Sequence, residues 1–247
     1  GQAVAPLPPA RGTYHLPLSA ARKEHAMSPE FSCANCEKVV CHTEHAEEGP
    51  ANCPTKTMRG TFEAVSEEYR KPEVAEFARQ ASIQEFECYL QLPEGTTPRN
   101  PRIEETAQFA RKMGYHKLGI AFCAGLRNEA RILDEVLTRR GFEVVSVCCK
   151  AGGIAKETIG IAPEQKIAGP DKFESMCNPI AQATLLNEAK TEFNIVVGLC
   201  VGHDSLFFRY ADAPTTVLIA KDRVFGHNPA AGLYQAKSYY AKLRRRE

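Results

Sequence analysis

The stretch Lys117-Leu-Gly-Ile-Ala-Phe-Cys123-Ala-Gly125 decides the fold. It is a short apolar run that ends in a turn of small residues, and this combination predicts a buried strand followed by a loop. Residues 127–140 then carry apolar side chains at helical spacing, and Gly141 closes that pattern. One strand leading directly into one amphipathic helix is the first unit of an α/β fold.

The same alternation continues toward the C-terminus. Further strands are predicted from the remaining apolar runs, at 142–148, 194–200 and 215–220. Residues 178–192 are expected to form a helix between two of these strands, and 234–243 can form a closing helix. Strands that alternate with helices favour a parallel sheet with helices on its faces. The prediction is therefore an α/β domain with a small, parallel, Rossmann-like three-layer sheet.

Three segments precede this domain, which spans 115–247. Residues 1–27 are Ala- and Pro-rich and are expected to be a leader or a disordered extension, while 28–58 are rich in cysteine and poor in apolar residues. Residues 59–114 form a helical connector, in which an imperfect apolar stripe from Val74 to Leu90 predicts one helix and Pro93–Pro101 a break. The expected order is a Cys-rich metal-binding module, the connector and the sheet domain.

Bulk composition narrows the function classes. The formal net charge is +1, which gives no reason to expect nucleic acid or an anionic membrane as a partner. No run of about 18 apolar residues predicts a membrane span. The N-terminus has no continuous apolar stretch like that of a secretory signal, so a cytoplasmic location is expected. In that compartment thiols stay reduced, and clustered cysteines indicate metal ligands or redox groups.

The first cysteine group lies near the N-terminus, with the spacing C-x2-C, then x4-C, then x11-C-P. Its members are Cys33, Cys36, Cys41 and Cys53. Four thiolates close together in sequence suit a metal centre with soft sulfur ligands. A [4Fe-4S] cluster is the favoured cofactor, because the gaps lack the second C-x2-C pair of a zinc ribbon and a proline follows the last cysteine. A structural zinc site is the alternative.

A second group of cysteines follows the predicted strands of the sheet domain. Cys123, Cys149 and Cys200 stand at three strand ends, and Cys177 precedes a predicted helix. Ligands of open parallel sheets bind beyond the carboxyl ends of the strands, so these thiols are expected to meet at one edge. They can bind a second cluster or metal, or include a reactive thiol. The opposing interpretation is core packing, since free cysteine is often buried; it is the one adopted for Cys88.

Polar and glycine-rich turns follow the same strands. His203 and Asp204 come just after Cys200 and are the candidate catalytic groups together with that thiol. Gly125, Arg127 and Gly202 lie in turns that lead into helices, where backbone N–H groups can hold a cofactor or an anion. No G-x-G-x-x-G or P-loop pattern is present, so nucleotide binding is only weakly indicated.

Several of these motifs together resemble one known family. They are Cys33-Ala-Asn-Cys36, Cys41, Cys53-Pro-Thr55, Phe122-Cys-Ala-Gly-Leu-Arg-Asn-Glu-Ala130, Cys177-Asn-Pro179 and Gly198-Leu-Cys-Val-Gly-His-Asp-Ser205. The chain is similar over roughly 30–245 to the DUF1847 proteins, described as uncharacterised metal-binding proteins of archaea and anaerobic bacteria. The resemblance implies a cytoplasmic protein of an anaerobe and carries no assigned reaction.

The sequence as a whole predicts an iron–sulfur metalloprotein with a redox or sulfur-handling role, possessing a second cysteine-lined site at the sheet edge. An iron–sulfur-dependent oxidoreductase or a sulfur-transfer enzyme would use these groups, with an electron-transfer protein or a small-molecule substrate as partner. The alternatives are a non-enzymatic protein for metal trafficking or sensing, and a module that zinc merely stabilises.

Overall fold

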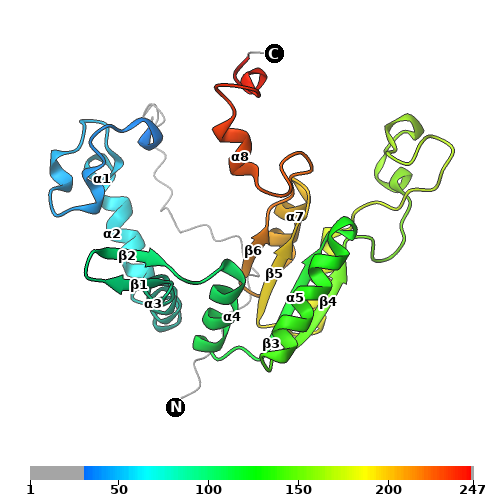
Figure 1. Ribbon diagram of the computed structural model, residues 1–247, viewed down its shortest axis with the longest axis horizontal. Coiled ribbons are helices and arrows are strands. Elements are labelled where there is room, and N and C mark those ends of the chain that lie inside the picture. Colours follow the sequence, from blue (N-terminus) through cyan, green and yellow to red (C-terminus); the bar gives the residue numbers. More distant parts are fainter. Residues whose placement is uncertain (1–30, 246–247) are drawn as a thin grey trace. The chain divides into compact units, whose positions relative to one another are not determined.

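The computed structural model describes residues 31–245, and the leader expected at 1–27 lies outside them. The described chain divides into two compact units, 31–79 and 80–245. Helix α3 (Pro72–Glu87) begins in the first unit and ends in the second. Each unit is described separately below (Figure 1).

The first unit consists of short helical turns and helices. Single 3₁₀ turns form at Cys33–Asn35, Val40–His42 and Ala46–Glu48, followed by α1 (Pro54–Thr57), α2 (Arg59–Glu68) and the first half of α3. Across 31–79, Gly49 alone is buried, so no apolar side chain described in this unit is fully buried. A hydrophobic core therefore does not account for the folding of this segment.

A β-hairpin opens the second unit, at a place where the sequence predicted the end of a helix. Strand β1 (Tyr89–Leu92) pairs antiparallel with β2 (Gly95–Pro98), with Leu90 opposite Thr97. The helix expected to run to Leu90 ends at Glu87, which corrects that part of the prediction. Gly95 has a φ of +134°, which only glycine adopts easily, and it allows the tight reversal after Pro93.

The sheet domain confirms the predicted fold class. Four parallel strands lie in the order β4-β3-β5-β6. Their bounds are β3 (Lys117–Phe122), β4 (Glu143–Cys148), β5 (Phe193–Val197) and β6 (Thr215–Ile219). Strand β3, the first strand of this sheet, is thus internal. Strand β4 pairs with one side of β3, and β5 pairs with the other side. Loops at the carboxyl ends of β3 and β5 separate at this point, where open sheets bind ligands.

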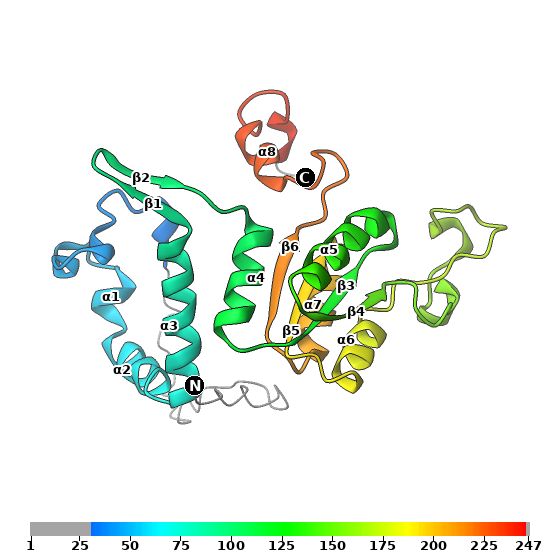
Figure 2. The same ribbon diagram turned by 60° about the horizontal axis from the view of Figure 1, so that its bottom comes forward.

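Helices cover both faces of the sheet. They are α4 (Arg102–Lys112), α5 (Arg127–Arg139), α6 (Pro179–Glu188) and α7 (His203–Tyr210). Figure 2 shows α5 on one face of the sheet and α6 on the other. On the α6 and α7 face, the core contains Ala121, Val196, Leu186 and Phe207, all at most 1% exposed. Two helix layers around one sheet give the three layers that the sequence predicted.

The remaining segments are less regular. Residues 150–178 leave the sheet between β4 and α6 and contain only 3₁₀ turns, at Lys156–Ile159 and Pro163–Gln165. The helix expected over 234–243 is not formed. Helix α8 (Pro229–Tyr234) begins earlier, because Pro229 presets the φ of a first helical turn, and a 3₁₀ turn follows at Ala241–Arg244. Of the helices in 31–245, none is long and apolar enough to cross a membrane.

Candidate functional site

A cavity of about 360 Å³ in the first unit is lined by three of the four cysteines predicted there. They are Cys33, Cys36 and Cys53, joined by Lys38 and Asn52. Cys33 lies in the first 3₁₀ turn and Cys36 caps it, its N–H donating to the Cys33 carbonyl oxygen at 3.1 Å. The C-x2-C spacing thus places two thiols on one tight turn, and Cys53 reaches the same cavity from 17 residues further along the chain.

The backbone next to Cys36 is unusual. Val39 has a φ of 41°, a left-handed conformation that is strained for a β-branched residue. In this conformation the Val39 N–H donates to the Cys36 sulfur at 3.4 Å. Strained backbone persists where the surrounding structure requires it, and hydrogen bonds to cysteine sulfur tune metal–thiolate centres. The turn after Cys36 therefore has a feature expected of a ligand loop.

Cys53 immediately precedes α1, and a hydrogen bond from the Thr55 side chain lowers the pKa of the Cys53 thiol below its ordinary value. Gly49 lies close to the same sulfur, since a Cβ added to Gly49 would lie 3.4 Å from Cys53 Sγ. A lowered pKa favours the thiolate, which is the form that binds a metal ion.

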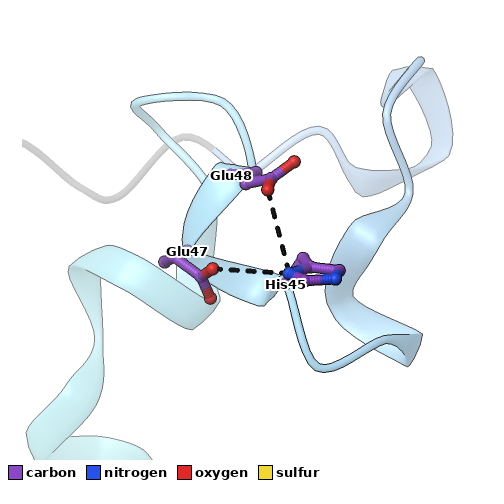
Figure 3. A group of neighbouring side chains, drawn as sticks. All are labelled: His45, Glu47 and Glu48. Carbon is purple, nitrogen blue, oxygen red and sulfur yellow. Dashed lines mark ion pairs between the residues drawn. The ribbon is translucent and has the colours of Figure 1, made fainter.

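Cys41 is not among the residues that line this cavity; it is exposed in the second 3₁₀ turn. Beside it in sequence, Nδ1 of His45 lies 3.9 Å from a carboxylate oxygen of Glu47 and 3.8 Å from one of Glu48 (Figure 3). This is the one group of three potential metal-ligand side chains in 31–245 whose donor atoms all lie within 4.8 Å of one another. All three side chains are exposed, and the arrangement is that of ion pairs formed when His45 is protonated.

The sheet edge brings together three of the four thiols predicted for it. Cys123 directly follows β3 and its N–H donates to the Val197 carbonyl oxygen of β5 at 3.0 Å. Cys149 directly follows β4, its sulfur accepts the Ala124 N–H at 3.4 Å, and the Cys123 and Cys177 side chains both pack against the core cluster that contains it. Cys177 returns to this point because the Asn178 N–H donates to the Cys149 carbonyl oxygen at 2.7 Å.

The three thiols differ in burial and in charge. Cys149 is 2% exposed, whereas Cys123 and Cys177 are half-buried. Hydrogen bonds from Cys149 lower the pKa of Cys123 and that of Cys177 to about 5 each, and the same two contacts raise the pKa of Cys149.

Basic side chains surround these sulfurs. Lys221, two residues beyond β6, places Nζ 3.5 Å from Cys123 Sγ. Lys150 bonds through Nζ to the Ser175 carbonyl oxygen at 2.6 Å, and its charge helps to lower the pKa of Cys177. Positive charge near a sulfur favours the thiolate. Neither lysine was predicted as a site residue from the sequence. Their positions just after two strands could have indicated that they lie at the sheet edge.

Cys200 lies further along the loop than predicted, since β5 ends at Val197. Its sulfur accepts a hydrogen bond from Arg223 Nη2 at 3.1 Å, and the charges of Cys123 and Cys177 also act on Arg223. Arg223 therefore connects Cys200 to the other sheet-edge thiols. His203 begins α7, and its charge contributes to the lowered pKa of Cys177.

Of the other residues predicted for this site, some border the thiols and others do not. A Cβ on Gly125 would lie 3.4 Å from Lys221 Nζ and 3.8 Å from Cys123 Sγ, so its backbone borders the site. Arg127 is exposed at the start of α5. Gly202 has a φ of +85°, and its N–H donates to Asp204 Oδ1, which also accepts the Ser205 N–H. This Asp204 oxygen thus caps the start of α7.

Gln182 is a further residue that the sequence argument missed. It is fully buried in α6, and its Nε2 donates to the carbonyl oxygens of Phe122, at 3.2 Å, and Val147, at 2.7 Å. These carbonyls belong to the ends of β3 and β4, just before the residues that supply thiols. One side chain therefore fixes the two strand ends at the site.

Comparison with known proteins identifies the family of this chain. The family model described as "Protein of unknown function (DUF1847)" matches residues 53–218, which include the four sheet-edge cysteines and the last cysteine of the first unit but not Lys221 or Arg223. An uncharacterized protein of Methanocaldococcus jannaschii is 42% identical over 213 residues, covering 86% of this chain and 98% of the relative. The cysteine-rich chain with a parallel α/β sheet therefore belongs to the DUF1847 family.

Proposed function

We propose that this protein is an iron–sulfur metalloprotein with a redox or sulfur-handling role. The first unit binds the cluster through its cysteines, and the thiols at the sheet edge form a second reactive site. The observation that carries the proposal is the combination in residues 31–79 of four cysteines with no buried apolar side chain. Small units without a core usually depend on a metal or on disulfides, and these cysteines are free.

The cysteine spacing favours a cluster over a single zinc ion. Four sulfurs, each about 2.3 Å from one zinc ion, lie about 3.8 Å from one another in a tetrahedral site. Among the residues that the structure describes, no three cysteine sulfurs lie within 4.8 Å of one another. Cysteines around a cubane bind different irons and stand farther apart, which suits Cys33, Cys36 and Cys53 around a cavity of about 360 Å³.

The chain's own groups would hold and tune such a cluster. Cys33, Cys36 and Cys53 would be ligands, and Cys41 would complete the set by movement of its exposed turn. The Val39 N–H would remain bonded to the Cys36 sulfur and withdraw charge from it. A bound [4Fe-4S] cluster supplies one-electron transfer.

The sheet edge supports the redox or sulfur-handling part of the proposal. Cys123, Cys149 and Cys177 gather there with Lys150 and Lys221, and Arg223 links Cys200 to them, at the edge where parallel sheets bind ligands. Half-buried thiolates beside cations are reactive nucleophiles. An electron-transfer protein or a small molecule would be the partner.

The test is purification without oxygen, with the visible spectrum and the iron, zinc and sulfide content measured per chain. A brown protein with about four irons and an equal amount of sulfide is expected. Cys53→Ser should lose most of this iron. The matched control is Cys88→Ala, because Cys88 is buried outside both sites, bonded by Gln84 at 3.3 Å. A colourless protein containing one zinc would overturn the iron–sulfur proposal.

A further inference from the structure

Three thiols gather at the sheet edge, with Cys149 between the other two. Cys149 Sγ accepts the Ala124 N–H at 3.4 Å, next to Cys123 in the chain, and the Cys123 and Cys177 side chains both pack against the core cluster that contains Cys149. The middle residue is 2% exposed and the outer two are half-buried. A reagent in solution therefore reaches the outer sulfurs first, and Cys149 contacts either of them from inside the protein.

The backbone holds Cys149 and Cys123 at the spacing of a disulfide. Phe122 of β3 is in register with Cys148 of β4, and the Cys149 N–H donates to the Phe122 carbonyl oxygen at 2.8 Å. The next positions, Cys123 and Cys149, are thus neighbours across parallel strands, which lie about 4.8 Å apart. Disulfides need a Cα separation of roughly 4.4–6.8 Å, so this pair can be joined with little backbone movement.

Cys177 is held on the other side of the same residue. The Asn178 N–H donates to the Cys149 carbonyl oxygen at 2.7 Å, which fixes the backbone around Cys177 beside Cys149. Lys150 Nζ bonds to the Ser175 carbonyl oxygen at 2.6 Å and ties the same segment to the end of β4. Two hydrogen bonds thus hold the returning chain where its thiol meets that of Cys149.

We propose that Cys123, Cys149 and Cys177 form a dithiol–disulfide relay that reduces an anionic low-molecular-weight disulfide, with Cys149 as the internal partner of both outer thiols. The relay goes beyond the proposed iron–sulfur function and does not require a cluster in the first unit. It gives the sheet edge a reaction of its own.

The steps balance in atoms and electrons. The Cys177 thiolate attacks one sulfur of the external disulfide, forming a mixed disulfide and releasing one substrate thiolate. The Cys149 sulfur then attacks Cys177 Sγ, forming the Cys149–Cys177 disulfide; the second substrate thiolate leaves, and the Cys149 proton passes to it. The substrate gains two electrons and the protein dithiol loses two. Attack by Cys123 on Cys149 moves the disulfide to Cys123–Cys149 and frees Cys177, with no net electron change.

The charges around the sulfurs select the substrate class. Lys221 Nζ lies 3.5 Å from Cys123 Sγ, Lys150 acts on Cys177, and Arg223 bonds to Cys200. These three cations face two outer thiolates, so the site retains positive charge while both are ionised. A disulfide that bears carboxylates is attracted there, and its departing thiolates are stabilised.

The experiment uses the full-length protein, reduced, freed of reductant and kept without oxygen. It is mixed with oxidised glutathione, an anionic disulfide, or with cystamine, a cationic one. We expect peptide mass spectrometry to identify Cys149–Cys177 or Cys123–Cys149 as the bond formed, with two glutathione thiols released for each such bond. Oxidised glutathione should react roughly tenfold faster than cystamine at low salt, because of the cations.

Variants separate the relay from ordinary thiol exchange. Cys149→Ser should stop at a mixed disulfide on Cys123 or Cys177, with one glutathione bound and one released. Cys148→Ser, altered at the neighbouring thiol, should behave like the wild type, and circular dichroism should show both variants folded. A bond that excludes Cys149, or a wild type that stops at the mixed disulfide, would overturn the relay; equal rates with both disulfides would overturn the substrate class. Iron and sulfide content, measured separately, reports on the first unit alone.

Discussion

Gly119 shows how a single missing side chain shapes the sheet. It lies in β3 opposite Asn194 of β5, and a Cβ built on it would lie 2.2 Å from Asn194 Oδ1 and 3.0 Å from a methyl carbon of Leu186. Asn194 is fully buried, and its Oδ1 accepts a hydrogen bond from Thr191 at 2.8 Å. The glycine therefore provides the room that a buried amide needs between two central strands.

Gly119→Ala should lower the free energy of unfolding of the sheet domain by about 1–3 kcal/mol, since the added methyl overpacks the core. Urea unfolding followed by circular dichroism measures the loss. Gly60→Ala, in α2 where a Cβ would meet nothing within 4 Å, is the comparison. It should cause no loss, and equal losses in the two variants would contradict the explanation.

The outer thiols at the sheet edge should remain reactive in mild acid. Because Cys123 and Cys177 have a pKa of about 5, their alkylation by iodoacetamide should change little between pH 8 and pH 6.5. An ordinary thiol with a pKa of about 8.5 slows by roughly tenfold per unit over the lower part of this range. Residue-specific mass spectrometry of the reduced, metal-free protein gives the rates.

Cys149→Ala should abolish this acid reactivity at both positions. The substitution removes the hydrogen-bond donor that is the largest cause of the lowered pKa values, so each pKa should rise toward that of a free thiol. A pH profile that did not shift in this variant would show that the lysines, not Cys149, hold the thiolates.

At the scale of elements, α6 fixes the strand ends that supply the thiols. Gln182 uses one amide nitrogen to satisfy carbonyls at the ends of β3 and β4. Gln182→Leu should cost about 1–3 kcal/mol of unfolding free energy, because the Phe122 and Val147 carbonyl oxygens both lose the amide donor, although the Phe122 oxygen keeps the Cys149 N–H. Thr184→Leu, on the exposed side of the same helix, is the control and should change stability by less than about 0.5 kcal/mol. Chemical denaturation of both variants decides the matter.

Elements with strong local patterns were predictable, and those that depend on tertiary contacts were not. The run 117–123 and the helical pattern after it carry their own periodicity, so β3 and α5 form where they were expected. The hairpin at Tyr89–Pro98 was missed, because Tyr89 and Leu90 continue the apolar stripe of α3 and only pairing with Pro98 and Thr97 makes them a strand. Local spacing alone does not reveal such a partner.

The sheet-edge site was predictable in its location and not in its details. The predicted strand ends placed Cys123 and Cys149 together, because the carboxyl ends of parallel strands lie at the same edge of a sheet. The contact between Cys149 and Cys177 depends on the return of segment 150–178, which has no regular pattern to interpret. The same holds for Lys221, which meets Cys123 across 98 residues of sequence.

At the scale of the whole molecule, the two units should respond differently to loss of metal. Residues 31–79 have no buried apolar side chain among those described, whereas the sheet domain has a continuous core. Chelation should therefore open the first unit and leave the second folded. Limited proteolysis before and after chelation should show new cleavage within 31–79 only. Cleavage spread equally over both units would contradict this division.

The order of the elements along the chain also determines when each group of cysteines can come together during translation. All four cysteines of the first unit have been made by residue 53, but Cys123 hydrogen-bonds to Val197, so the sheet edge waits for β5. On the ribosome, at about 5–20 residues per second, several seconds separate the two events. The four cysteines of the first unit are thus complete before Cys149 can be buried. During that interval the central thiol is open to wrong partners, which gives the cell a reason to keep thiols reduced until translation ends.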